Sequence, residues 1–280
     1  MRRGIKNRNL LIGLFIISSL VFIAVFAPQI APHDPIKANP KIRLEQPSKE
    51  YPFGTDHMGR CILSRIIFGA RISLLIGVIV IMGSLLIGII LGAVSGYFGG
   101  LADDVIMRIV DGVLAVPSMF LALALAGSLG PGLFNMAMAL IFVEWTSYAR
   151  VVRGSILSVK EMGFIEAARS LGASDFYILV RHVLPNIISP VIVIATLGIG
   201  YVILAAAGMS FLGLGAQPPT PEWGSMLDDG RLFMRKAPHI MIFPGLAIMI
   251  TVLAFNFLGD GLRDEMDPRT QNGDATMRMM

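Results

Sequence analysis

The chain has 280 residues, of which 55% are hydrophobic and 15% are charged, and its mean hydropathy is +0.72. This composition excludes an ordinary soluble domain of this length and indicates a protein whose solvent is largely the lipid bilayer. The net charge of +4 comes from dispersed basic residues without interleaved aromatic residues, which argues against nucleic-acid binding. The single cysteine, Cys61, excludes an intrachain disulfide.

The N-terminal stretch combines positive charge with an apolar run from Leu10 to Phe26. This run is longer than the apolar part of a typical signal peptide, and Pro28 directly follows Ala27, the best small residue for cleavage. We therefore predict that the run is retained as the first membrane helix.

Six apolar runs approach the roughly 20 residues that a helix needs to cross the hydrocarbon core. They cover approximately residues 10–30, 72–96, 106–128, 133–152, 188–213 and 239–259. Because backbone polar groups must be satisfied internally in lipid, the runs predict an all-α, polytopic bundle of six transmembrane helices. We place both termini in the cytoplasm, although the seven basic residues between Lys37 and Arg71 weaken the positive-inside bias.

Residues 153–186 form the long polar stretch between the fourth and fifth runs. Four apolar residues there fall at helical spacing and predict one apolar face: Phe164, Ala167, Ala168 and Leu171. Gly172 is predicted to end this helix, and Ser174 is placed to cap a second one. Two short helices around a glycine turn predict a compact knob that a partner protein could receive in a groove.

The pattern Glu166-Ala167-Ala168, Gly172 and Leu184-Pro185 resembles the EAA loop of ABC-importer permeases. The family pattern expects isoleucine where this chain has His182. The resemblance implies that the 160–186 segment docks into an ATPase subunit through Phe164, Glu166, Ala167, Ala168, Leu171, Gly172, Leu184 and Pro185. The alternative is an ordinary amphipathic helix lying on the inner leaflet.

Nearly the whole chain is similar to the dipeptide, oligopeptide and nickel branch of these permeases, as a C-type subunit. The similarity rests on Gly54-Thr55-Asp56-His57-Met58-Gly59-Arg60, on Phe211-Leu212-Gly213-Leu214-Gly215, and on the ending from Gly259 through Pro268. Trp145 and the stretch Ala207-Gly208-Met209-Ser210 lean slightly toward nickel-type members.

This resemblance implies three parts: an anchor helix with an external loop (1–71), the permease core (72–270) and a C-terminal tail (271–280). It also implies a prokaryotic plasma (inner) membrane location, a homologous second permease subunit, two ATP-binding subunits and an extracytoplasmic solute-binding protein. The chain has no Gly-x-x-x-x-Gly-Lys-Ser/Thr motif, so ATP and Mg²⁺ are expected only on the partner ATPases. We expect no catalytic residue, cofactor or metal ligand set in this chain, and inward transport by alternating access.

Candidate pathway residues are Glu144, Met209 and Asn256. A charged side chain inside a span is costly and suggests a function, so Glu144 could meet a substrate cation, or it could pair with a neighbouring helix. Asn256 could equally hydrogen-bond across helices. The alternatives for the whole chain are an ion-coupled secondary transporter, which should show internal repeats, a membrane-embedded enzyme, and a membrane scaffold.

Overall fold

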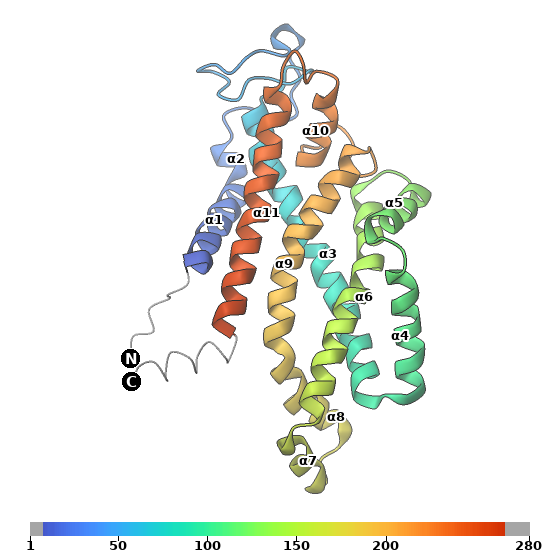
Figure 1. Ribbon diagram of the computed structural model, residues 1–280. Helices are drawn as coiled ribbons and strands as arrows, with labels where there is room; N and C mark the ends of the chain where they lie inside the picture. The colour runs from blue at the N-terminus through green and yellow to red at the C-terminus, as the bar shows by residue number, and fades with distance from the viewer. Residues whose placement is uncertain (1–7, 267–280) are drawn as a thin grey trace, which may run out of the picture.

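The computed structural model describes residues 8–266, which are mostly helical (Figure 1). Within this range the β structure amounts to one isolated bridge between Thr55 and Cys61, so the predicted all-α class is confirmed. The elements are α1 (Arg8–Val25), α2 (Ala27–Ile30), η1 (Pro40–Ile42), α3 (Ile62–Phe98), α4 (Gly100–Leu114), α5 (Ser118–Leu129), α6 (Leu133–Lys160), α7 (Gly163–Ser170), α8 (Asp175–Ile178), η2 (Leu179–Val183), α9 (Leu184–Phe211), α10 (Trp223–Arg231) and α11 (His239–Met266).

Four helical stretches of the described chain are long and apolar enough to cross a membrane: α1, α3, the continuous stretch Asp175–Phe211, and α11. The pair α4 and α5 makes a fifth if it counts as one bent span. Helix α6 has 28 residues and sufficient length, but Glu144 and Arg150 within it lower its hydropathy. The number of six spans and the orientation of the termini therefore stay predictions.

The third predicted span, 106–128, is not one helix. Helices α4 and α5 are bent by 88° at the break between Leu114 and Ser118. Pro117 explains the break, because a proline lacks the N–H that would continue the helix and its ring disfavours helical backbone at Val116 before it. The break turns the chain sharply beside α6 (Figure 1).

Helix α3 begins at Ile62, ten residues before the predicted start, so the predicted boundary at 71/72 falls inside it. Its most extensive packing is against α6. Glycines make this close approach possible, since a Cβ at Gly92 would lie 2.6 Å from the Ala149 carbonyl oxygen, and one at Gly88 would lie 2.6 Å from Cβ of Tyr148. Small residues thus hold α3 and α6 together as the centre of the bundle.

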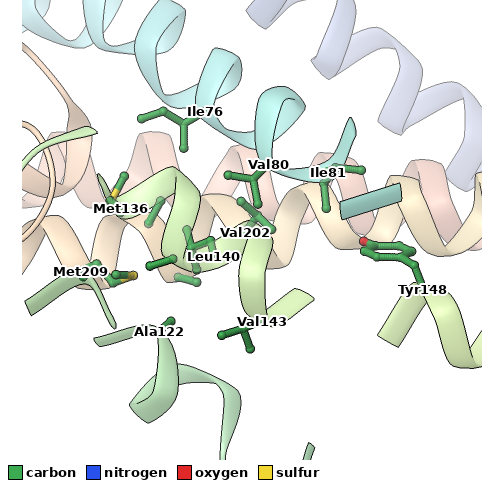
Figure 2. Packing of buried hydrophobic residues seen from close by; sticks show 14 residues of the cluster. Ile76, Val80, Ile81, Ala122, Met136, Leu140, Val143, Tyr148, Val202 and Met209 are labelled. Carbon is green, nitrogen blue, oxygen red and sulfur yellow. The ribbon is translucent and has the colours of Figure 1, made fainter. Parts of the chain in front are cut away.

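Large apolar side chains from four helices fill the interior around this pair (Figure 2). Val80 of α3, Met136 of α6 and Val202 of α9 are fully buried there, and Ala122 of α5 closes one side. Helices α1 and α11 pack against each other and flank α3 and α9.

Two regions of loops and short helices lie at opposite ends of the bundle (Figure 1). At one end, residues 31–61 and 212–238 form what we call the cap, which includes α10. At the other end lie α7 and α8 of the 160–186 segment. The long helices α3 and α9 run between these ends (Figure 1).

Candidate functional site

The 160–186 segment folds as a short helix, a glycine turn and a capped second helix, as predicted. Helix α7 ends at Ser170, and Gly172 follows with φ of +81°, a conformation that glycine adopts without steric cost. Ser174 then caps α8 by accepting a hydrogen bond from the backbone N–H of Tyr177. The second helix is not separate from the fifth span, because α8 continues through the π-helical turn η2 into α9.

Three isoleucine and valine side chains anchor this segment to the bundle. Ile165 of α7, Ile178 of α8 and Val183 of η2 are fully buried against Ile156 of α6 and Ala93 of α3. The inward face of α7 is therefore formed by Ile165 with the half-buried Ala168. Of the apolar face predicted to meet a partner protein, Phe164, Ala167 and Leu171 are exposed, and its role in docking stays a prediction.

The opposite surface of the segment is apolar and open. Leu171 is 88% exposed and Phe176 is 75% exposed, and Phe164 of α7 is also exposed. Of the predicted docking residues, Ala168 and Leu184 are half-buried, and the others are exposed: Phe164, Glu166, Ala167, Leu171, Gly172 and Pro185. Exposed large apolar side chains on an otherwise anchored knob are typical of a protein interaction surface.

Polar contacts fasten the segment to the ends of α3 and α6. The Tyr97 hydroxyl donates a hydrogen bond to Asp175 at 2.8 Å, and Lys160 Nζ donates to the Tyr97 carbonyl oxygen at 2.7 Å. Nearby, Arg153 of α6 forms a bidentate ion pair with Asp103 of α4, both bonds being 2.6 Å. Sequence reasoning missed these contacts, because the partners are 50 to 78 residues apart and share no periodic pattern.

Glu144 lines a cavity of about 400 Å³ where the break between α4 and α5 faces α6 and α9. No hydrogen bond or ion pair joins Glu144 to another residue in the described part of the chain. The other candidate pathway residues lie elsewhere. Met209 is fully buried in the packed interior, and Asn256 is exposed on α11. The pathway roles of all three remain predictions.

The motif around Asp56 builds a buried charge network in the cap. Arg60 binds Asp56 at 2.6 Å and Asp229 at 2.9 Å, and Arg65 lies 3.6 Å from each carboxylate. Asp56, His57 and Asp229 bring possible ligand atoms within 4.8 Å of one another. The two arginines already balance both carboxylates, so the charge that would attract a metal cation is compensated.

A second buried carboxylate orders the other half of the cap. Glu222 is 2% exposed, and it accepts hydrogen bonds from the N–H groups of Gly224 and Ser225 at the start of α10, each at 2.9 Å. Burial raises the pKa of Glu222, and these N–H donors oppose that rise. The sequence reasoning did not single out Glu222, because glutamate is not among the residues usually preferred at an N-cap, which are Ser, Thr, Asp and Asn.

Comparison with known proteins identifies two families in the chain. Residues 84–272 match the family described as binding-protein-dependent transport system inner membrane component. Residues 1–47 match the N-terminal TM domain of oligopeptide transport permease C.

Named relatives cover almost all of the chain. The chain is 46% identical to the dipeptide transport system permease protein DppC of Alkalihalophilus pseudofirmus over 267 residues. This alignment covers 95% of this chain and 88% of the relative. The chain is 49% identical over 258 residues to the glutathione transport system permease protein GsiD of Shigella dysenteriae, covering 92% and 85%. The names of these relatives give no support to the slight lean toward nickel.

A solved structure shares the fold. The inward-facing MetNI methionine ABC transporter has a chain with a TM-score of 0.59 and 19% identity, covering 72% of this chain and 96% of that one. The family match spans more than half of the sequence, and the relatives are nearly half identical over more than nine-tenths of it. The chain therefore belongs to the binding-protein-dependent transport system inner membrane components, as a multi-pass ABC-importer permease of the dipeptide, oligopeptide and nickel branch.

Proposed function

We propose that this chain is one of two permease subunits in an importer that carries short peptides, such as dipeptides or glutathione, into the cell. The two relatives named above are permeases for dipeptides and for glutathione, which supports this substrate class. The other subunits in the proposal are a homologous permease, two ATPases that bind ATP and Mg²⁺, and an extracytoplasmic binding protein that delivers the peptide.

The exposed apolar surface of the 160–186 segment is the observation that carries the proposal. Leu171 and Phe176 leave a large apolar area uncovered, while Ile165 and Ile178 hold the same segment firmly against α3 and α6. A knob that is open on one side and rigidly attached on the other can transmit a push from a docked ATPase. Closure of the ATPases around ATP would move the knob with α6 and α9, and the bundle would then alternate between outward and inward openings.

Replacing Leu171 by glutamate tests the docking. The Leu171→Glu variant places a charge in the proposed contact, and we expect the chain to lose affinity for its ATPase subunits by at least about tenfold. Peptide-stimulated ATP hydrolysis should fall with it. The measurement is co-purification of the full transporter from membranes, followed by the ATPase assay with the binding protein and a dipeptide.

Leu232→Glu provides the matched control. Leu232 is 81% exposed but follows α10 in the cap, at the other end of the bundle. The control should co-purify with the ATPase subunits as the native chain does. If Leu171→Glu behaves like Leu232→Glu, the 160–186 segment is not the ATPase contact and the proposed function loses its main support.

A further inference from the structure

The cavity beside Glu144 has the size and the polar groups of a small-molecule site. Its volume of about 400 Å³ lies within the usual range of about 300 to 1,000 Å³ for such sites. Val116 from the break between α4 and α5 and Val143 of α6 provide apolar wall. The polar groups come from three helices: Ser118 of α5, Glu144 and Ser147 of α6, and Tyr201 of α9.

Glu144 has a carboxylate without a compensating cation in the described part of the chain. The basic residues that follow it on α6 are all engaged elsewhere: Arg150 binds Asp111 at 2.6 Å, Arg153 binds Asp103, and Lys160 binds the Tyr97 carbonyl oxygen. A half-buried carboxylate among apolar helices is costly unless a cation or several donors meet it. The cavity is therefore missing one positive group.

Two hydroxyls that line the same cavity can hold the rest of a peptide. The hydroxyls of Ser118 and Tyr201 lie 2.9 Å apart and form a polar pair from α5 and α9. Tyr201 is 44% exposed, so its hydroxyl can exchange this partner for a peptide amide. A carboxylate on one helix and two hydroxyls on others match a molecule with an ammonium group next to an amide bond.

We propose that Glu144 binds the N-terminal ammonium of the transported peptide, so that the cavity is a transient site for peptides with a free amino terminus. This inference rests on the proposed function and adds a requirement to it. Peptides whose amino terminus is acetylated should lose this contact.

Charge-selective labelling of a cysteine in the cavity tests the proposal. Ser147 lines the cavity and is exposed, and the chain has one native cysteine, Cys61, which is buried. In the assembled transporter carrying Ser147→Cys, the modification rate is measured with a cationic and an anionic methanethiosulfonate reagent. The transporter with native Ser147 gives the background from Cys61.

The ratio of the two rates should depend on Glu144. We expect the ratio of the cationic to the anionic labelling rate to be about tenfold higher with Glu144 than in Glu144→Gln, because a fixed charge raises the local concentration of counter-ions. Glu144→Asp should retain most of this preference. An unchanged ratio in Glu144→Gln overturns the proposal, and so does failure of both reagents to react, because the cavity would then be closed.

Protection by peptides supplies a test that needs no substitution of Glu144. Without the binding protein, glycyl-leucine should slow the labelling of the introduced thiol in the Ser147→Cys transporter, whereas N-acetyl-glycyl-leucine should not. Equal effects of the two peptides overturn the proposal.

Transport in the same preparation separates this inference from the proposed function. If the native transporter imports glycyl-leucine with ATP but the labelling of the Ser147→Cys transporter is independent of Glu144, only the ammonium site fails. If the chain neither assembles with ATPase subunits nor supports import of any short peptide, the proposed function fails as well.

Discussion

Tyr97 joins the 160–186 segment to the bundle by both its side chain and its backbone. Its hydroxyl donates to Asp175, its carbonyl oxygen accepts from Lys160, and the Lys160 ammonium lies 5.7 Å from the centre of the ring. The residue is 3% exposed and lies at the end of α3. One residue thus meets the last residue of α6 and the first residue of α8, which makes it a fixed point for the knob.

Tyr97→Phe removes the hydroxyl and keeps the ring. We expect it to weaken the attachment of α8 to α3 by about 1 kcal/mol, the net worth of a typical hydrogen bond. Hydrogen exchange of the amides in 175–178 should then accelerate by roughly fivefold, while the ATPase subunits still bind. Tyr177→Phe is the control, since Tyr177 is 51% exposed and its exchange should stay unchanged. Equal protection in Tyr97→Phe and the native chain would contradict the role of this contact.

At the scale of the elements, the pairing of α3 with α6 depends on the absence of side chains. Gly88, Gly92 and Gly96 recur at four-residue spacing along α3, and each faces the backbone or Cβ atoms of α6. Helices in lipid gain little from the hydrophobic effect between them, so close packing across small residues is a main source of association.

Gly92→Ala tests this contact with one added carbon. The new Cβ would lie 2.6 Å from the Ala149 carbonyl oxygen and 2.9 Å from Cβ of Val152, so α3 and α6 must separate. We expect a loss of about 1 to 3 kcal/mol in stability, seen as a lower melting temperature of the purified transporter. Gly112→Ala is the matched control, because nothing lies within 4 Å of its added Cβ and alanine favours the helix. Equal melting temperatures of the two variants would rule out the close approach.

At the scale of the whole molecule, the cap is tied together by charges from distant parts of the chain. Asp56 and Arg60 come from the first loop, Arg65 from the start of α3, and Asp229 from α10. Arg65 also donates to the carbonyl oxygens of Pro35 and Pro219, at 3.3 and 3.4 Å. The network therefore joins the two cap segments, 31–61 and 212–238, to the start of α3.

Removing Arg60 leaves the buried Asp56 and the half-buried Asp229 with one arginine, Arg65, between them. We expect Arg60→Ala to destabilise the protein by about 3 kcal/mol, because an uncompensated buried charge is costly. The measurement is thermal unfolding of the purified transporter. Arg231→Ala breaks the exposed pair with Asp228, and this control should cost less than about 1 kcal/mol. If Arg60→Ala lowers the stability no more than Arg231→Ala does, the network does not hold the cap together.

The local pattern of the chain was sufficient to predict its helical class, the glycine turn at 172 and the cap at Ser174. These features depend on near neighbours in sequence: apolar periodicity, the positive φ that glycine allows, and a hydroxyl placed before a helix. The EAA pattern similarly pointed to the 160–186 segment, because its residues are close together in the chain. Single positions such as Glu144 were recognisable because a carboxylate within an apolar run is unusual.

What the sequence by itself determined was which stretches are apolar helices and where they turn. Only the tertiary structure decided which helices meet, that Pro117 turns the chain by 88° beside α6, and that Glu144 faces a cavity without a cation. It also decided that Arg60 meets Asp229, 169 residues away, and that Ile165 anchors α7 to the bundle. Periodicity specifies a face of a helix, whereas the partner of that face depends on the packing of the whole bundle.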